Sequence, residues 1–290
     1  MQKNKTIIMI VAALMFVLAL GLTLYPPVSN YVNAKYASQI HTAYEEVIQK
    51  TDNSALVDER SRANAYNRSI TPGAMPVEAF SKEAITRASE NYEDILNISD
   101  DGIMGYLSIP KLEMELPIFH GTGPDALERG IGHLLGSSLP VGGESTHTIL
   151  TGHSGMATQK MFTDLVNLAV GDVFYLDILG DTLAYQVEEQ NTVLPHDTSF
   201  LSVVPGEDLC TLVTCTPYGV NTHRLLVRGS RIPYEEAQEI EKETSTEEAP
   251  DSAWEEEYIK GVAIGLLILL ILLLIIFFVG NQRRGHYEAG

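Results

Sequence analysis

"TLVTCTPYGVNTHRLL", residues Thr211 to Leu226, reads as the end of one β-strand, a loop and the start of the next strand. Side chains alternate between the two faces of a strand, so Val213 and Cys215 share one face and Cys210 lies on the other. If the chain turns back after the loop, Arg224 at the start of the second strand lies across from Cys215. The stretch therefore predicts a pair of neighbouring strands that brings a thiol and a guanidinium together.

From Gly102 onward the sequence consists of short β-prone runs separated by Gly, Pro, Asn and Asp. The seven runs are "MGYLSI", "MELPIF", "HTILT", "DVFYLDIL", "TLAYQVEE", "LCTLVT" and "RLLVRG". Such a succession favours a closed or nearly closed antiparallel barrel over a parallel sheet. We expect this mainly-β domain to cover residues 102–234, with one helix inside it, from Thr158 to Leu168.

The segment before the barrel, residues 29–101, shows the spacing of helices instead. Apolar residues recur at helical intervals from Ser29 to Ile70, with a break around Asp52, which predicts two helices. A third helix is expected from Phe80 to Leu96. The Pro and Gly residues of "TPGAMP", Thr71 to Pro76, predict a loop between them.

Two uncharged apolar runs, Ile7 to Tyr25 and Gly261 to Val279, are long enough to cross a membrane. Each would span about 28 Å as a helix, close to the thickness of the hydrocarbon core. We expect transmembrane helices within residues 1–28 and 259–280. The first run has an alternative interpretation as a cleaved signal peptide, because Val32 to Ala34 loosely resembles a cleavage site.

Basic residues flank both runs on their outer sides. Lys3 and Lys5 precede the first run, and Arg283 and Arg284 follow the second. Flanking cations stay on the cytoplasmic side of a membrane. We therefore expect a two-pass protein whose ends, including the basic tail 281–290, are cytoplasmic and whose middle faces the exterior.

The formal net charge of −19 is concentrated near the C-terminus. Residues 235–258 form an acidic stretch that we expect to be a solvated helix or coil, serving as a mobile tether. An acidic chain without a basic stripe argues against nucleic acid as a partner.

The two cysteines are expected to be free thiols. Five steps along one strand place the Cα atoms of Cys210 and Cys215 roughly 16 Å apart, too far for a disulfide. Cys210 in mid-strand is expected to be a packing residue, whereas Cys215 ends its strand beside a loop and is the candidate nucleophile. A thiol needs help to react at neutral pH, and His223 and Arg224 are the nearest helpers in the sequence.

Residue type alone does not choose the histidine that would serve this thiol. The candidates are His120, His133, His147, His153 and His223. None has the spacing of a metal site, and the cysteines do not form C-x-x-C, so neither a metal nor another cofactor is expected. "TGHSGM" fails the G-x-S-x-G pattern at Met156, which argues against Ser154 as a nucleophile.

The combination of "TLVTC", "NTHR" and the upstream "LTGHSG" resembles the sortases, the transpeptidases of Gram-positive cell surfaces. The resemblance covers roughly Gly102 to Arg231. The helical N-terminal region and the second apolar run make the chain similar to the pilin-polymerising class C. The family fold implies a closed eight-stranded β-barrel.

The resemblance also implies roles for individual residues. His153 is the catalytic histidine, Cys215 the nucleophile and Arg224 the residue that holds the oxyanion and positions the substrate. Thr214 is implied to contribute near the oxyanion site.

The implied reaction cleaves an LPxTG-like sorting signal after Thr and joins the acyl group to a lysine amine of another pilin subunit. Pilin subunits and the membrane are thus the implied partners, and the cell surface is the implied location. Two departures from the family stand out. No Asp-Pro-aromatic triplet marks a lid, although "TPGAMPVEAF" lies where one is expected, and Ser154 follows the histidine where many relatives have Arg.

Other functions are open at this point. A sortase that anchors proteins to the cell wall and a hydrolysing cysteine peptidase share the same first step, and a silent peptide-binding barrel would share the fold. A sortase substrate also ends in an apolar run and basic residues, but no LPxTG-like pentapeptide precedes Gly261.

Overall fold

The computed structural model describes residues 2–70, 92–156, 159–244, 258–267 and 269. The chain divides into two compact units. One unit is Asn30–Pro250, and the other combines Met1–Ser29 with Asp251–Gly290.

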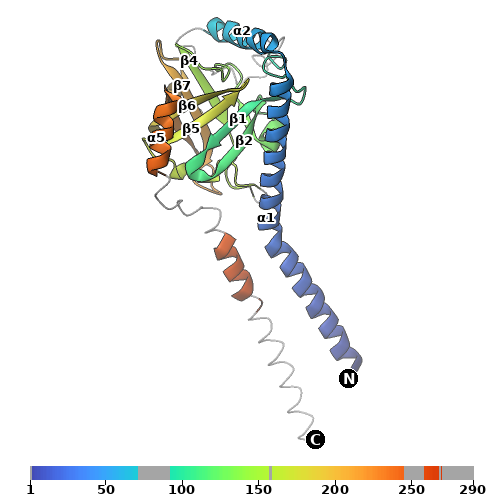
Figure 1. Ribbon diagram of the computed structural model, residues 1–290. Helices are drawn as coiled ribbons and strands as arrows, with labels where there is room; N and C mark the ends of the chain where they lie inside the picture. The colour runs from blue at the N-terminus through green and yellow to red at the C-terminus, as the bar shows by residue number, and fades with distance from the viewer. Residues whose placement is uncertain (1, 71–91, 157–158, 245–257, 268, 270–290) are drawn as a thin grey trace, which may run out of the picture. The chain divides into compact units, whose positions relative to one another are not determined.

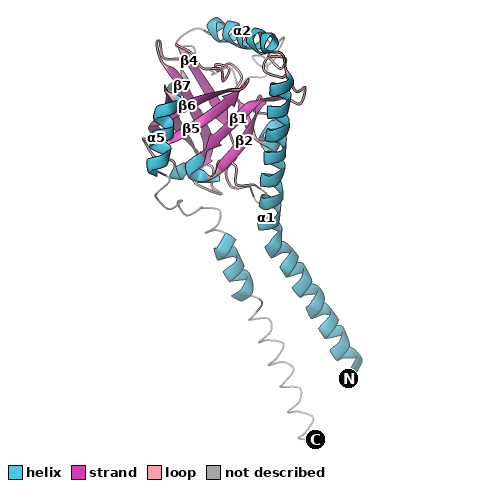
Figure 2. Ribbon diagram, in the orientation of Figure 1, coloured by secondary structure: helices cyan, strands magenta, loops and turns pink. Residues whose placement is uncertain are grey.

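Eight strands of the larger unit close into a β-barrel (Figures 1 and 2). They are β1 (Ile103–Ile109), β2 (Met114–His120), β3 (Ile131–His133), β4 (Thr146–Thr151), β5 (Val173–Ile178), β6 (Asp181–Val193), β7 (Asp208–Thr216) and β8 (His223–Ile232). Around the barrel the order is β1-β2-β3-β4-β7-β8-β6-β5. The closed eight-stranded barrel is confirmed, and all seven β-prone runs form strands.

The expectation of an antiparallel barrel was wrong for two of the pairings. β2 pairs with β3 in parallel, and β4 pairs with β7 in parallel. Parallel neighbours need a crossover. The chain crosses through the short helix α4 (Pro124–Arg129) in the first case and through β5 and β6 in the second. The β-prone runs did not include β3, because its three residues are too few to show alternation.

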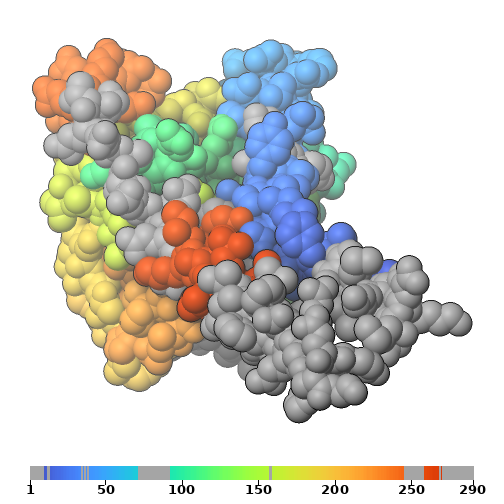
Figure 3. Space-filling model, turned by 90° about the horizontal axis from the view of Figure 1, so that it is seen from below, coloured from blue at the N-terminus to red at the C-terminus, as the bar shows by residue number. Residues whose placement is uncertain are grey.

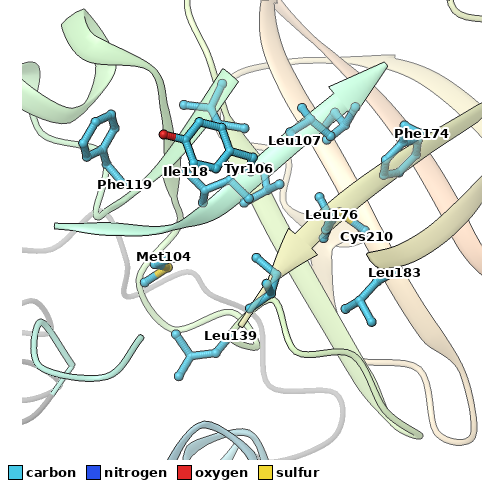
Figure 4. Packing of buried hydrophobic residues seen from close by; sticks show 14 of the residues in the cluster. Met104, Tyr106, Leu107, Ile118, Phe119, Leu139, Phe174, Leu176, Leu183 and Cys210 are labelled. Carbon is cyan, nitrogen blue, oxygen red and sulfur yellow. The ribbon is translucent and has the colours of Figure 1, made fainter. Parts of the chain in front are cut away.

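Buried side chains on the two faces of β7 belong to two different clusters. Cys210 and Leu212 lie in the large cluster that fills the barrel, where Figure 4 shows Cys210 among residues from β1 and β5. Val213 lies in a second group, here called the outer cluster. Its members are Leu134, Ile149, Val193, Leu201, Val213 and Leu226, with Phe200 packed against them. The alternation predicted for this strand is therefore confirmed.

Two helices precede the barrel, as predicted for the segment up to Ile70. They are α1 (Gln2–Lys50) and α2 (Asn53–Ser69), and Asp52 caps the second by accepting a hydrogen bond from the Ser54 N–H (3.3 Å). The Tyr44 hydroxyl of α1 donates to the Met104 carbonyl and accepts from the Leu179 N–H, both at 3.2 Å. Figure 3 shows the blue atoms of α1 next to the light-blue atoms of α2.

The third predicted helix, from Phe80 to Leu96, falls mostly outside the described residues, as does "TPGAMP". Its end, Tyr92–Leu96, forms turns. The helix predicted inside the barrel is a short 3-10 helix, η3 (Thr163–Asn167), preceded by turns. Two further 3-10 turns are η2 (Pro110–Leu112) and η4 (Ser199–Leu201).

The beginning of the acidic stretch is not a solvated tether. Residues Tyr234–Thr244 form the helix α5, which packs on the barrel beside β5 and β6 (Figure 2). Ala237 is fully buried, and the Tyr175 hydroxyl donates to the Glu241 carboxylate at 2.7 Å. An apolar stripe on one face of a glutamate-rich helix therefore extends the folded unit beyond Tyr234. Residues 245–257 lie outside the described part of the chain.

One helical stretch among the described residues, Leu14–Asn33, is long and apolar enough to cross a membrane. It overlaps the first predicted run. Of the second run, the structure describes an apolar helical stretch over Tyr258–Leu267. The remainder of that run lies almost entirely outside the described residues, so the second span stays a prediction.

Candidate active site

Cys215 and Arg224 face each other across the pairing of β7 and β8. The two residues are direct partners in the antiparallel register, followed by Thr216 and His223 at the end of the ladder. Directly opposite side chains lie on the same face of a sheet, with Cβ atoms about 5 Å apart. The predicted pairing of the two residues across neighbouring strands is confirmed, and both side chains are half-buried.

The Arg224 guanidinium is held by the loop that joins the two strands. Its Nη1 donates to the His223 carbonyl at 3.0 Å and to the Asn221 carbonyl at 3.4 Å. The loop itself is fixed by the Asn221 N–H, which donates to the Pro217 carbonyl at 2.9 Å. Two main-chain acceptors thus orient a planar cation at the strand end opposite Cys215. A fixed cation in such a place can stabilise negative charge that develops on an attacked carbonyl oxygen.

His153 lies just past the end of β4, and the parallel pairing of β4 with β7 brings this end of β4 to the end of β7 that carries Cys215. The last register partners are Thr151 and Val213, each two residues before His153 and Cys215. Beyond the end of β4, the Gly152 N–H donates to the Val213 carbonyl at 3.0 Å. These contacts join the ends of β4, β7 and β8 and bring His153, Cys215 and Arg224 to one end of three adjacent strands.

The residue before the histidine must be small. A Cβ atom on Gly152 would lie 2.7 Å from the Phe162 ring. Phe162 is itself fully buried, and its N–H donates to the His153 carbonyl at 3.0 Å. The glycine of Thr-Gly-His therefore lets an aromatic ring cover the strand end and hold the main chain of the histidine.

Two of the other candidate histidines are built into the protein interior. His133 contacts the Tyr92 hydroxyl through Nδ1 (2.8 Å) and the Ser138 carbonyl through Nε2 (2.9 Å). Burial lowers the pKa of His133 to about 4. Burial also lowers the pKa of His147 to about 4. The ring of His147 contacts the Ser202 carbonyl (2.9 Å) and the Thr211 hydroxyl (2.7 Å).

The last two candidates lie elsewhere as well. The two ring nitrogens of His120 contact the carbonyls of Ile95 (2.7 Å) and Gly102 (3.0 Å), so this ring ties β2 to the turns before β1. His223 is the register partner of Thr216, which puts it on the opposite face of the sheet from Arg224. His153 is therefore the remaining candidate at the strand ends that carry Cys215 and Arg224, and its catalytic role stays a prediction.

The predicted secondary residue Thr214 faces the barrel interior. It is 3% exposed, and its hydroxyl donates to the Gly152 carbonyl at 2.8 Å. This bond gives Thr214 a part in joining β4 to β7, and its contribution to oxyanion binding stays a prediction. Cys210 is fully buried, as expected for a packing residue, and both cysteines are free thiols.

Ser154 forms a contact with the site that the sequence did not indicate. Its hydroxyl donates to the main-chain carbonyl of Cys215 at 2.7 Å. No sequence pattern signals such a bond, because the acceptor is a main-chain atom on a distant strand. Within the residues that the structure describes, no group of three His, Cys, Asp or Glu side chains is placed to hold a metal ion.

Known proteins share both the sequence and the fold of this region. The model of the sortase domain matches residues 107–232. Sortase D of Bacillus subtilis (strain 168) is 31% identical over 131 residues, which are 44% of this chain and 63% of that relative. The match thus spans less than two thirds of the length of that protein.

Solved structures are similar over a larger share of the chain. Sortase C1 from Streptococcus agalactiae is 45% identical with a TM-score of 0.62, covering 67% of this chain and 98% of that chain. Sortase C of Streptococcus pneumoniae is 39% identical with a TM-score of 0.61, covering 68% of this chain and 97% of that chain. Together with the sortase domain and the geometry of the site, these similarities show that the chain belongs to the sortase family of cysteine transpeptidases.

Proposed function

We propose that this chain is a class C sortase that polymerises pilins at the cell surface. The observation that carries the proposal is the meeting of His153, Cys215 and Arg224 at the ends of three adjacent strands. The similar solved structures support the choice of class, because they are sortases C, and the Streptococcus pneumoniae enzyme among them has a specificity for pilin substrates.

The first half of the proposed reaction forms a thioester. The Cys215 sulfur attacks the carbonyl carbon of Thr in an LPxTG-like sorting signal, and the Arg224 guanidinium stabilises the resulting oxyanion. His153 donates a proton to the departing Gly amine, so the peptide bond breaks and the acyl group stays on sulfur. The chemistry needs an acid and a nucleophile on neighbouring positions, which the parallel register of β4 and β7 supplies.

The second half transfers the acyl group to a lysine of the next pilin. The uncharged lysine amine attacks the thioester carbonyl, the sulfur leaves, and an isopeptide bond forms. His153 accepts the proton that the amine loses. This returns the enzyme to its starting state and makes the overall reaction a ping-pong transfer.

The outer cluster supports the strand ends that carry the proposed nucleophile and arginine. Val213 and Leu226, each two residues from Cys215 or Arg224, lie on the same sheet face as those side chains and belong to this cluster. They are 8% and 3% exposed, so they form a packed base beneath the site.

The proposed location follows from the apolar runs. Leu14–Asn33 can cross a membrane, and Tyr258–Leu267 begins a second apolar run. We propose two spans with cytoplasmic ends, which leave residues 30–250 on the extracellular face.

The test is to incubate the full-length chain in detergent with an LPxTG-type peptide and to search for an acyl adduct by mass spectrometry. The proposal expects an adduct on Cys215, lost in Cys215→Ala, and its transfer to an added lysine-containing pilin peptide. An adduct that only water resolves would favour a hydrolysing peptidase, and transfer to a cell-wall amine alone would favour a wall-anchoring sortase. No adduct at all would favour the silent peptide-binding barrel.

A further inference from the structure

The hydroxyl of Ser154 links the two reacting residues of the site. Ser154 follows His153 directly, and its Oγ donates to the carbonyl of Cys215 at 2.7 Å. The bond therefore joins the neighbour of the proposed acid to the main chain of the proposed nucleophile. The side chains of Ser154 and Cys215 are both half-buried, so water competes less for the Cys215 carbonyl than it would at an exposed strand end.

This bond continues the parallel ladder of β4 and β7 past the end of β4. In a parallel ladder, every second residue of one strand bonds to its neighbour. The Gly152 N–H donates to the Val213 carbonyl, and the next acceptor in this series is the Cys215 carbonyl. Here the side chain of residue 154 supplies the donor.

The side-chain donor is needed because the main chain turns away at this point. Gly155 has a φ of +77°, a conformation that favours glycine, and its N–H donates to the Thr163 hydroxyl at 3.0 Å. A hydroxyl on Ser154 can still reach the Cys215 carbonyl after the main chain has left the plane of the sheet. The chain can therefore turn at Gly155 and still keep a hydrogen bond to the end of β7.

The same turn also touches the loop between β7 and β8, next to Arg224. A Cβ atom on Gly155 would lie 3.4 Å from the ring of Tyr218, so the bare glycine packs beneath that ring. The segment Ser154–Gly155 thus contacts both the strand end of Cys215 and the β7–β8 loop.

We propose that Ser154 is a positioning residue, which fixes His153 against Cys215. His153 lies between two anchors, the Gly152 N–H bond and the Ser154 hydroxyl bond, and both end on β7 within two residues of each other. The two anchors hold the main chain of His153 against β7 on both sides of the residue. The Phe162 and Thr163 contacts also hold this segment, but the Ser154 hydroxyl bond is what ties the residue after His153 to the strand of Cys215.

The inference rests on the proposed function, and its test uses the same acylation reaction. Loss of the hydroxyl in Ser154→Ala is expected to lower the kcat of acylation about 10- to 100-fold, since misplacement of reacting groups by about 1 Å has effects of this size. KM is expected to stay unchanged, because Ser154 acts on the reacting pair and is not proposed to contact the sorting signal. Ser154→Thr keeps a hydroxyl and is expected to recover most of the rate.

Two substitutions of similar shape separate the effect of the hydroxyl hydrogen bond from the effect of side-chain packing. Threonine carries a hydroxyl where valine carries a methyl group, so Ser154→Thr is expected to have a higher kcat than Ser154→Val. Ser61→Ala is the control for loss of a serine bond as such. The Ser61 hydroxyl donates to the Val57 carbonyl at 2.9 Å on exposed α2, and its loss is expected to leave kcat unchanged.

The outcomes distinguish the two levels of the proposal. If the unaltered chain forms no adduct, the proposed function fails and this inference fails with it. If the unaltered chain reacts but Ser154→Ala keeps its kcat, the positioning role alone is overturned. If Ser154→Ala does not fold, equal kcat values for Ser154→Thr and Ser154→Val overturn it.

Discussion

Cys215 and Arg224 are direct partners in the antiparallel register of β7 and β8. The pairing fixes the separation of the two residues through the sheet itself, and two main-chain carbonyls orient the guanidinium. Charge stabilisation at this position therefore depends on the planar shape of arginine as well as on its charge.

Arg224→Lys is expected to lower kcat/KM for acyl transfer by about two to three decades, the usual effect of losing an oxyanion donor. The lysine ammonium keeps the charge but cannot bond the loop carbonyls and the oxyanion with one planar group. Steady-state kinetics with an LPxTG-type peptide measures the loss. Arg228→Lys, on the same strand and paired with Glu188 and Glu189 at the surface, is the control. A rate for Arg224→Lys near that of the unaltered chain would contradict the role.

The two cysteines are expected to separate activity from stability. Cys215→Ala abolishes the acyl adduct and leaves the denaturant midpoint nearly unchanged, because its side chain is half-buried at a strand end. Cys210→Ala keeps the adduct but lowers the free energy of unfolding by about 1 kcal/mol, because it removes a buried sulfur from the barrel. Mass spectrometry and urea denaturation of both variants check this. An adduct that persists in Cys215→Ala would be the contrary result.

Acid is expected to destabilise the fold through the two buried histidines. The pKa of His133 and of His147 falls from 6.5 to about 4 on folding. The unfolded chain thus binds more protons between these values, so stability is lost as the pH falls from about 6.5 to 4. Each histidine contributes up to about 3 kcal/mol to this loss.

Urea denaturation at several pH values checks this loss with His133→Gln. The variant is expected to show a smaller loss of unfolding free energy than the unaltered chain over the same pH range. His196→Gln, at an exposed position, is the control and should show the full loss. Identical pH dependence in all three proteins would refute the assignment.

Helix α5 is expected to be part of the stable domain. Ala237→Glu puts a charge into a fully buried position against β5 and β6 and should lower the unfolding free energy by about 2 to 4 kcal/mol. Glu236→Ala, next to it on the exposed side of the helix, should change it by less than about 0.5 kcal/mol. Thermal denaturation followed by circular dichroism measures both, and equal midpoints would mean that α5 does not stabilise the barrel.

The sequence was most informative where partners are neighbours along the chain. The β7–β8 pairing and the facing of Cys215 and Arg224 follow from alternation and one loop. The break between the first two helices at Asp52 was likewise visible, because an aspartate that caps a helix has a local partner.

Long-range pairings were beyond such reasoning. Nothing in residues 146–151 indicates that β4 lies parallel to β7, and this pairing is what selects His153 over the other histidines. The family resemblance supplied that choice. The packing of α5 was hidden by its glutamates, since only Ala237 and Ile240 mark its apolar side.

The parallel pairing of β4 and β7 affects when, during folding, the site around the Cys215 thiol is assembled. The segment between these strands contains β5 and β6, so their pairing joins residues that are far apart in the chain, a slow type of contact to form. Until the barrel closes, Cys215 has neither histidine nor guanidinium fixed beside it. We therefore expect acyl transfer to begin only once the barrel has closed, although the free thiol is present throughout.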